Sequence, residues 1–151
     1  MKKKLTILTL LAIIGLSSGF AQFQNIYNIY SIESVYLGIL GGYNDNGANS
    51  SEYAAHFSWA KVRSNYDILE ELVKKYCFQF DRQALFGKEA ANNFYAVASV
   101  RFASYGYDFG DSGANSTEKS RHLSWTYNKT IPEMRAELEK KLRFIMYAVS
   151  N

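Results

Sequence analysis

Apolar side chains recur at alternating spacings of four and three residues between positions 55 and 80, which is the periodicity of one face of an α-helix. The members of this seam are Ala55, Trp59, Val62, Tyr66, Leu69, Val73, Tyr76 and Phe80. A similar run closes the chain, with Met134, Leu138, Leu142, Ile145 and Val149. We therefore predict one continuous helical seam over 55–80, which could kink at 64–67, and a final helix that begins near Pro132.

Polar residues mark where these helices begin. Asn49 and Asn115 are good N-caps, and each is followed three residues later by a glutamate that can bond back to the N–H of the cap. Thr130 and Glu133 have the same spacing, and Pro132 between them suits a first helical turn. These signals predict helix starts at 49, 115 and 130.

Two further helices are predicted over 23–40 and 89–105. The second segment is rich in alanine and clearly favours a helix, whereas the first is ambiguous because Ile, Tyr and Val also favour strands. Stretches rich in Gly, Asn and Asp at 41–48 and 106–114 are typical of turns. Because almost nothing is left for strands, we predict an all-α fold, a bundle of four to six helices.

The chain contains an internal duplication. Residues 47–59 and 113–125 are identical at eight of thirteen positions, with an offset of 66. Both histidines and both tryptophans of the protein fall at matched positions within these segments. Further matches lie upstream, at an offset of 65, and downstream. We therefore expect two tandem repeats of about 65 residues, over 24–86 and 87–151, related by a pseudo-twofold and forming one closed domain rather than an open array.

The N-terminal segment has the layout of a bacterial secretory signal peptide. Three lysines at 2–4 precede an apolar run at 5–16, and Gly19-Phe20-Ala21 provides a small-residue cleavage site. We expect residues 1–21 to be removed, leaving a single helical domain at 22–151. The protein would then be exported through the Sec pathway and be periplasmic or secreted.

Removal of the signal changes the charge. The chain has 17 Lys+Arg and 14 Asp+Glu, so the loss of three lysines leaves 14 of each and no formal net charge. Neutrality excludes binding of a polyanion through bulk charge, so we expect no nucleic-acid partner. No later segment is long and apolar enough to suggest a membrane span.

The repeated Glu–His pairs are the candidate metal ligands. Glu52 lies four residues before His56, and Glu118 lies four before His122, so each pair shares a helix face. Facing helices of a bundle could bring the pairs together around a transition metal such as zinc or iron, or around a general acid–base centre of a small hydrolase. The alternative is structural, with the glutamates capping helices and the histidines packed at a seam.

Aromatic side chains supply the candidate binding surface. The predicted loops carry Tyr43, Tyr105, Tyr107 and Phe109, and the predicted helices carry Trp59 and Trp125. The lone cysteine, Cys77, has apolar neighbours and is expected to be buried. No nucleophile or nucleotide-binding motif occurs. We therefore expect a non-enzymatic binding module, of the inhibitor or immunity kind, with no cofactor and with another protein or a glycan as its partner.

Overall fold

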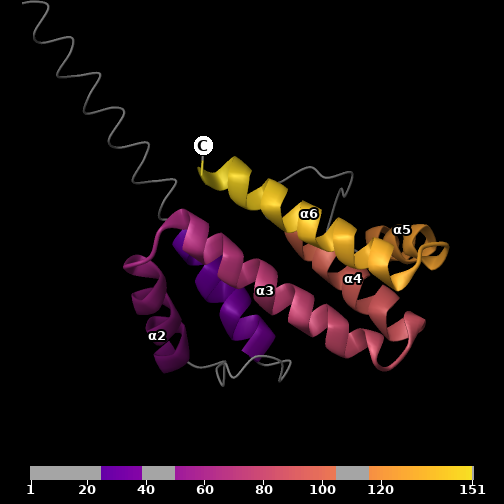
Figure 1. The fold of residues 1–151 in the computed structure, drawn as a ribbon, viewed down its shortest axis with the longest axis horizontal. Coiled ribbons are helices and arrows are strands. Elements are labelled where there is room, and N and C mark those ends of the chain that lie inside the picture. Colours follow the sequence, from indigo (N-terminus) through magenta and orange to yellow (C-terminus); the bar gives the residue numbers. More distant parts are fainter. Residues whose placement is uncertain (1–24, 39–49, 105–115, 151) are drawn as a thin grey trace, which may run out of the picture.

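A computed structural model describes residues 25–38, 50–104 and 116–150, and these residues form six helices and no strand (Figure 1). The helices are residues 25–38, α2 (Ser50–Lys61), α3 (Asn65–Ala84), α4 (Lys88–Ser104), α5 (Ser116–Tyr127) and α6 (Ile131–Ser150). The predicted all-α bundle is confirmed, and the ambiguous first segment is a helix. None of the described helices is both long and apolar enough to cross a membrane.

The two longest helices, α3 and α6, pack side by side and run antiparallel (Figure 1). Arg135 near the start of α6 meets Asp81 near the end of α3, and Arg143 further along α6 meets Glu70 near the start of α3. Helix α4 packs against both α3 and α6 and also against α5. The bundle is therefore organised around α3, α4 and α6.

The predicted continuous seam over 55–80 is wrong, because the chain breaks between α2 and α3. Ser64 caps α3: its hydroxyl accepts a hydrogen bond from the Asp67 N–H, and the Asp67 carboxylate accepts one from the Ser64 N–H. This reciprocal capping box starts a new helix at the place, residues 64–67, where the sequence analysis expected at most a kink. Three members of the proposed seam face solvent: Ala55 on α2, Val62, which is 75% exposed, and Tyr66, which is 69% exposed.

The matching break before α6 follows the prediction. Glu133 accepts hydrogen bonds from the Thr130 N–H and hydroxyl, and the Glu133 N–H donates back to the hydroxyl. Pro132 is the second residue of α6. The five predicted core residues of this helix are all buried, namely Met134, Leu138, Leu142, Ile145 and Val149.

The core also holds charged groups that the apolar pattern did not predict. The Glu33 carboxylate is fully buried, where it accepts hydrogen bonds from the Tyr76 hydroxyl and from Arg101 Nε, the latter at 2.6 Å. These three residues come from helix 25–38, α3 and α4. Because an unpaired buried carboxylate is costly, this cluster specifies how the three helices face one another.

Candidate binding groove

The two predicted Glu–His pairs lie on separate helices. Glu52 and His56 are on α2, and His122 is on α5, while the side chain of Glu118 lies outside the described part of the chain. Helices α2 and α5 are not among the closely packed helix pairs, and they lie toward opposite ends of the bundle (Figure 1). The described side chains contain no cluster of three potential metal ligands. The fold does not bring the two helices together around one ion.

Both histidines instead lie in packed surroundings. The Nε2 atom of each is shielded from solvent, and His122 as a whole is 6% exposed. The His56 ring lies edge-on to the Tyr30 ring, with ring centres 6.3 Å apart. These environments are consistent with the structural alternative, in which the histidines pack at a seam between helices.

Each tryptophan stacks on a tyrosine of another helix, either helix 25–38 or α4. Trp59 lies on Tyr30 with ring centres 5.0 Å apart, and Trp125 lies on Tyr95 at 6.0 Å. The interplanar angles are 23° and 27°, so both pairs are offset stacks. The two stacks are thus equivalent contacts made by residues at matched positions.

A cation covers each tryptophan. Arg63 lies 4.4 Å from the ring centre of Trp59, and Lys129 lies 3.9 Å from that of Trp125. Positions 63 and 129 are again 66 apart. Such cation–π contacts hold the indole rings in place while leaving part of their surface open, and Trp125 is 44% exposed.

Two buried lysines complete the matched pairs of contacts. Lys75 Nζ donates to the Ser34 hydroxyl and Lys141 Nζ donates to the Ser99 hydroxyl, both at 3.3 Å. The lysines are only 2% and 3% exposed. Lys74–Lys75 and Lys140–Lys141 are matched at the offset of 66 in the sequence. That match does not by itself indicate that one lysine of each pair enters the core.

An open groove of about 790 Å³ runs along the α3 side of the α3–α6 pair and reaches the end of α2. Trp59 and Tyr66 form an aromatic wall, and Cys77 lies on its floor. Four acidic and three basic side chains also line it. One of the predicted binding residues, Trp59, therefore lines this groove.

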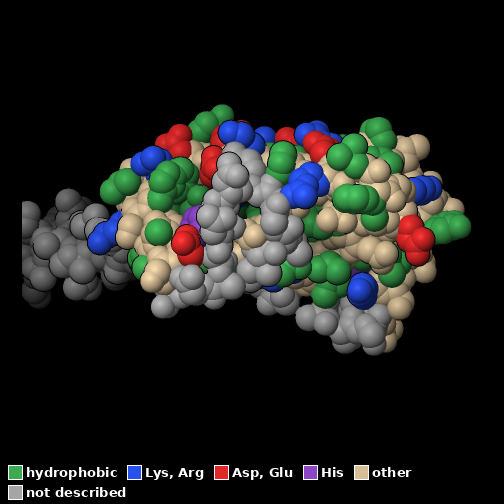
Figure 2. Space-filling view, turned by 90° about the horizontal axis from the view of Figure 1, so that it is seen from below, with side chains coloured by type: hydrophobic (Ala, Val, Ile, Leu, Met, Phe, Trp, Pro, Cys, Tyr) green, Lys and Arg blue, Asp and Glu red, His purple; other side chains and the backbone are tan. Residues whose placement is uncertain are grey.

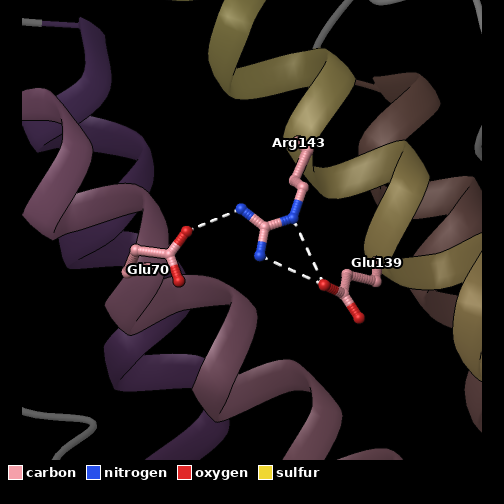
Figure 3. Close-up of polar contacts among 3 residues, drawn as sticks. All are labelled: Glu70, Glu139 and Arg143. Atoms are coloured by element: carbon pink, nitrogen blue, oxygen red, sulfur yellow. Dashed lines mark hydrogen bonds and ion pairs between the residues drawn. The ribbon is translucent and has the colours of Figure 1, made fainter.

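An arginine bridges the two helices beside the groove (Figure 3). Arg143 on α6 reaches Glu70 on α3 at 2.6 Å, and it also contacts Glu139 one turn earlier on its own helix at 3.1 Å. The hydrogen bond with Glu70 is the main reason why the pKa of Arg143 is raised, so the guanidinium stays charged. The bridge holds α3 and α6 at a defined separation along the groove.

The groove offers hydrogen bonding and aromatic contact rather than a reactive group. Burial raises the pKa of the Cys77 thiol, and Cys77 is only 5% exposed, which confirms that it is buried. A protonated, shielded thiol is a poor nucleophile. On the face that Figure 2 shows, acidic and basic side chains are interspersed with apolar ones, without a large patch of one sign.

Sequence reasoning missed Tyr66 and Glu71 as surface residues of this groove. Tyr66 had been given to the apolar seam, and the serine at 64 with the aspartate at 67 was the signal that could have corrected this. The four predicted loop aromatics, Tyr43, Tyr105, Tyr107 and Phe109, lie outside the described residues.

Comparison of the chain with protein-family models, with curated proteins and with solved structures gives no match.

Proposed function

We propose that this chain is an exported, non-enzymatic helical module that binds another protein through the groove between α3 and α6. In this proposal residues 1–21 are a signal peptide, and residues 22–151 are one domain of two tandem repeats related by a pseudo-twofold. The observation that carries the binding function is the aromatic wall of the partly buried Trp59 and the exposed Tyr66 over a groove with mixed charges.

Matched helix bounds support the repeat. Helices α2 and α5 have 12 residues each, and α3 and α6 have 20 each. The starts of the members of each pair are 66 residues apart, which is the offset of the duplicated sequence. The paired Trp–Tyr stacks and Lys–Ser hydrogen bonds recur at the same offsets.

One contact favours a twofold over a simple translation. Tyr36 and Arg101 are 65 residues apart, the offset that relates the first helices of the two repeats. The Arg101 guanidinium lies 3.9 Å from the ring centre of Tyr36. Contact between a residue and its own counterpart is expected next to a twofold axis. The antiparallel α3–α6 pair is consistent with the same axis.

The chemistry of the groove favours a protein partner. Aromatic side chains and arginine are enriched at protein interfaces, and here Trp59 and Tyr66 lie beside Arg63 and Arg135. Tyr66 is 69% exposed, so a partner could bury much of its ring. Burial of an anchoring tyrosine commonly contributes a large share of the binding energy.

The proposal is tested with a photoreactive residue placed at Tyr66 and, as a matched control, at Tyr147. Both tyrosines are 69% exposed, but Tyr147 lies outside the groove lining. We expect a specific cross-link to a protein in the exporting cell from position 66 and not from position 147. The captured protein, once purified, should bind Tyr66→Ala at least about tenfold more weakly than wild type, as for a hot-spot tyrosine.

Equal cross-linking at both positions, or no cross-link at 66, would contradict the groove as the binding site. A cross-link to a glycan would replace the protein partner with the other partner class that the aromatic surface allows. Intracellular retention of the full-length chain would contradict the exported part of the proposal.

A further inference from the structure

A second pocket, of about 500 Å³, lies between the first turns of α4 and the last turns of α5. It is lined by Lys88, Glu89, Asn92, Asn93, Leu123 and Tyr127. None of these residues lines the groove between α3 and α6, so an inference about this pocket goes beyond the function proposed above. Its size is in the range of small-molecule sites.

The matched place in the first repeat is filled by an aromatic side chain. Tyr27 corresponds to Asn92 at the offset of 65, and Phe57 corresponds to Leu123 at the offset of 66. Tyr27 is 5% exposed, and its ring packs edge-on against Phe57 with centres 6.0 Å apart. Its hydroxyl donates to the Lys61 carbonyl at 3.1 Å, and position 61 is the counterpart of Tyr127.

The second repeat has smaller side chains at both positions. Asn92 and Leu123 replace the two rings, and both residues line the open pocket. Asn92 is 5% exposed, and its amide oxygen Oδ1 is buried without a hydrogen bond to any described residue. A buried acceptor of this kind calls for a donor, because the great majority of buried polar atoms in proteins are satisfied. The pocket thus presents an unused acceptor where the first repeat packs a phenol ring.

We propose that this pocket binds a phenolic ring, supplied by a free phenol or by the tyrosine side chain of a peptide. The ring would occupy the space that Tyr27 fills in the first repeat, against Leu123 and the ring of Tyr127, which is 71% exposed. The phenol hydroxyl would donate to Asn92 Oδ1. Lys88, whose Nζ lies 5.7 Å from the centre of the Tyr127 ring, keeps the mouth of the pocket polar.

The test is an NMR titration of the exported chain with p-cresol and with toluene, which lacks the hydroxyl. We expect saturable shifts of the backbone amides at 88–93 and 123–127 with p-cresol. Binding of toluene should be about tenfold weaker, as expected when a buried acceptor loses its donor. Absence of saturable shifts up to the solubility limit of p-cresol would overturn the proposal, and so would equal binding of the two compounds.

Two variants separate filling of the pocket from hydrogen bonding. Asn92→Tyr should restore the internal ring of the first repeat and abolish p-cresol binding. Asn92→Leu keeps the size of the side chain but removes the acceptor, so it should bind p-cresol and toluene equally. Asn128→Ala changes an exposed asparagine that follows Tyr127 in the chain and does not line the pocket, so this variant should bind as wild type. Unchanged preference for p-cresol in Asn92→Leu would remove the role of the amide.

The source of the ring is resolved by comparing p-cresol with a short peptide that carries a central tyrosine, and with the same peptide carrying phenylalanine. Binding of p-cresol alone assigns the pocket to free phenols, whereas preferential binding of the tyrosine peptide assigns it to a protein segment. Cross-linking at Tyr66 reports on the groove independently, so failure of either proposal leaves the other standing.

Discussion

Glu33 shows how one residue can hold distant helices in register. Its buried carboxylate joins Tyr76 of α3 and Arg101 of α4, which are 43 and 68 positions away in the chain. An ion pair this far inside the bundle does not guarantee net stability, because desolvation opposes the Coulomb attraction. Removing Glu33 is different, since the Arg101 guanidinium then loses the buried carboxylate that it contacts at 2.6 Å.

We expect Glu33→Ala to lower the free energy of unfolding by about 3 kcal/mol. This value is near the lower end for a broken buried ion pair, because the Arg101 side chain is 26% exposed to solvent. Urea denaturation followed by circular dichroism measures this loss. The control is Asp81→Ala, which breaks the exposed ion pair with Arg135 and should cost about 1 kcal/mol or less. Equal losses in both variants would contradict a special role for Glu33.

Cys77 makes a second prediction for a single residue. Because burial raises the pKa of its thiol, the reactive thiolate is scarce in the folded state. We expect a thiol reagent such as dithionitrobenzoate to react slowly with the native protein and rapidly in denaturing urea. The raised pKa also means that any stability linked to this thiol is retained below the unfolded-state pKa and declines as the pH rises above it. Fast labelling of the native protein would show that the groove floor opens.

At the scale of the elements, capping boxes decide where α3 and α6 begin. Ser64→Ala removes the hydroxyl that accepts from the Asp67 N–H at 3.2 Å. We expect a loss of about 1 kcal/mol in the free energy of unfolding, as is usual for an N-cap serine. Ser58→Ala on the exposed face of α2 is the matched control and should change stability little. A similar loss in both would mean that the cap at 64 is not special.

The cap of α6 predicts a dependence on pH. The pKa of Glu133 is lowered chiefly by the hydrogen bond from the Thr130 N–H, at 2.7 Å, and further by the Thr130 hydroxyl. A lowered folded-state pKa contributes stability above the unfolded-state pKa, and this contribution is lost as the pH falls through the folded-state value. Glu133→Gln should therefore destabilise the protein at neutral pH and less so in acid.

Thermal unfolding from neutral to acid pH measures the difference between Glu133→Gln and wild type. Glu137→Gln, one turn further along α6 and outside the cap, is the matched control. A destabilisation by Glu133→Gln that stayed constant across this pH range would contradict the assignment.

At the scale of the whole molecule, contacts between the N-terminal and C-terminal halves of the chain, residues 24–86 and 87–151, predict a single unfolding unit. Helices α3 and α6 lie in different halves and pack together, and Glu33 in the first half pairs with Arg101 in the second. Each half contains one tryptophan, so Trp59→Phe and Trp125→Phe leave a fluorescent reporter in one half at a time. Within each variant, we expect fluorescence and circular dichroism to give the same denaturant midpoint. Different midpoints from the two methods within either variant would show that the halves unfold independently.

The helices and the start of α6 were predictable because they depend on local interactions. The predicted caps Asn49 and Asn115 lie outside the described residues. The face of α6 was identified correctly from five residues, since its cap and its periodicity agree. The same reasoning failed at Val62 and Tyr66, where the apolar spacing continued across a capping box. A helical period shows which residues would share one face of a helix. It cannot show that the helix has ended and a new one has begun between two of those residues.

The candidate site was predictable only in part for a similar reason. Matching the duplicated segments identified Trp59 and Trp125 as candidate binding residues, and both are partly exposed in the structure. It did not indicate that Tyr66 would join Trp59 along a groove, because the opposite wall comes from α6, about 70 residues later. It also gave equal weight to both Glu–His pairs, whose helices lie apart.

The sequence by itself therefore determined the all-α class, the cap and the core face of α6, and the matched positions of the duplicated segments, because short-range hydrogen bonds and periodic burial decide these features. Only the tertiary structure decided which matched residues meet, which charged groups enter the core, and where the surface remains open. Those outcomes depend on side chains that arrive from distant helices. The contrast between Tyr27 and Asn92 is an example: the sequence shows the substitution, but only packing against α5 turns it into a pocket.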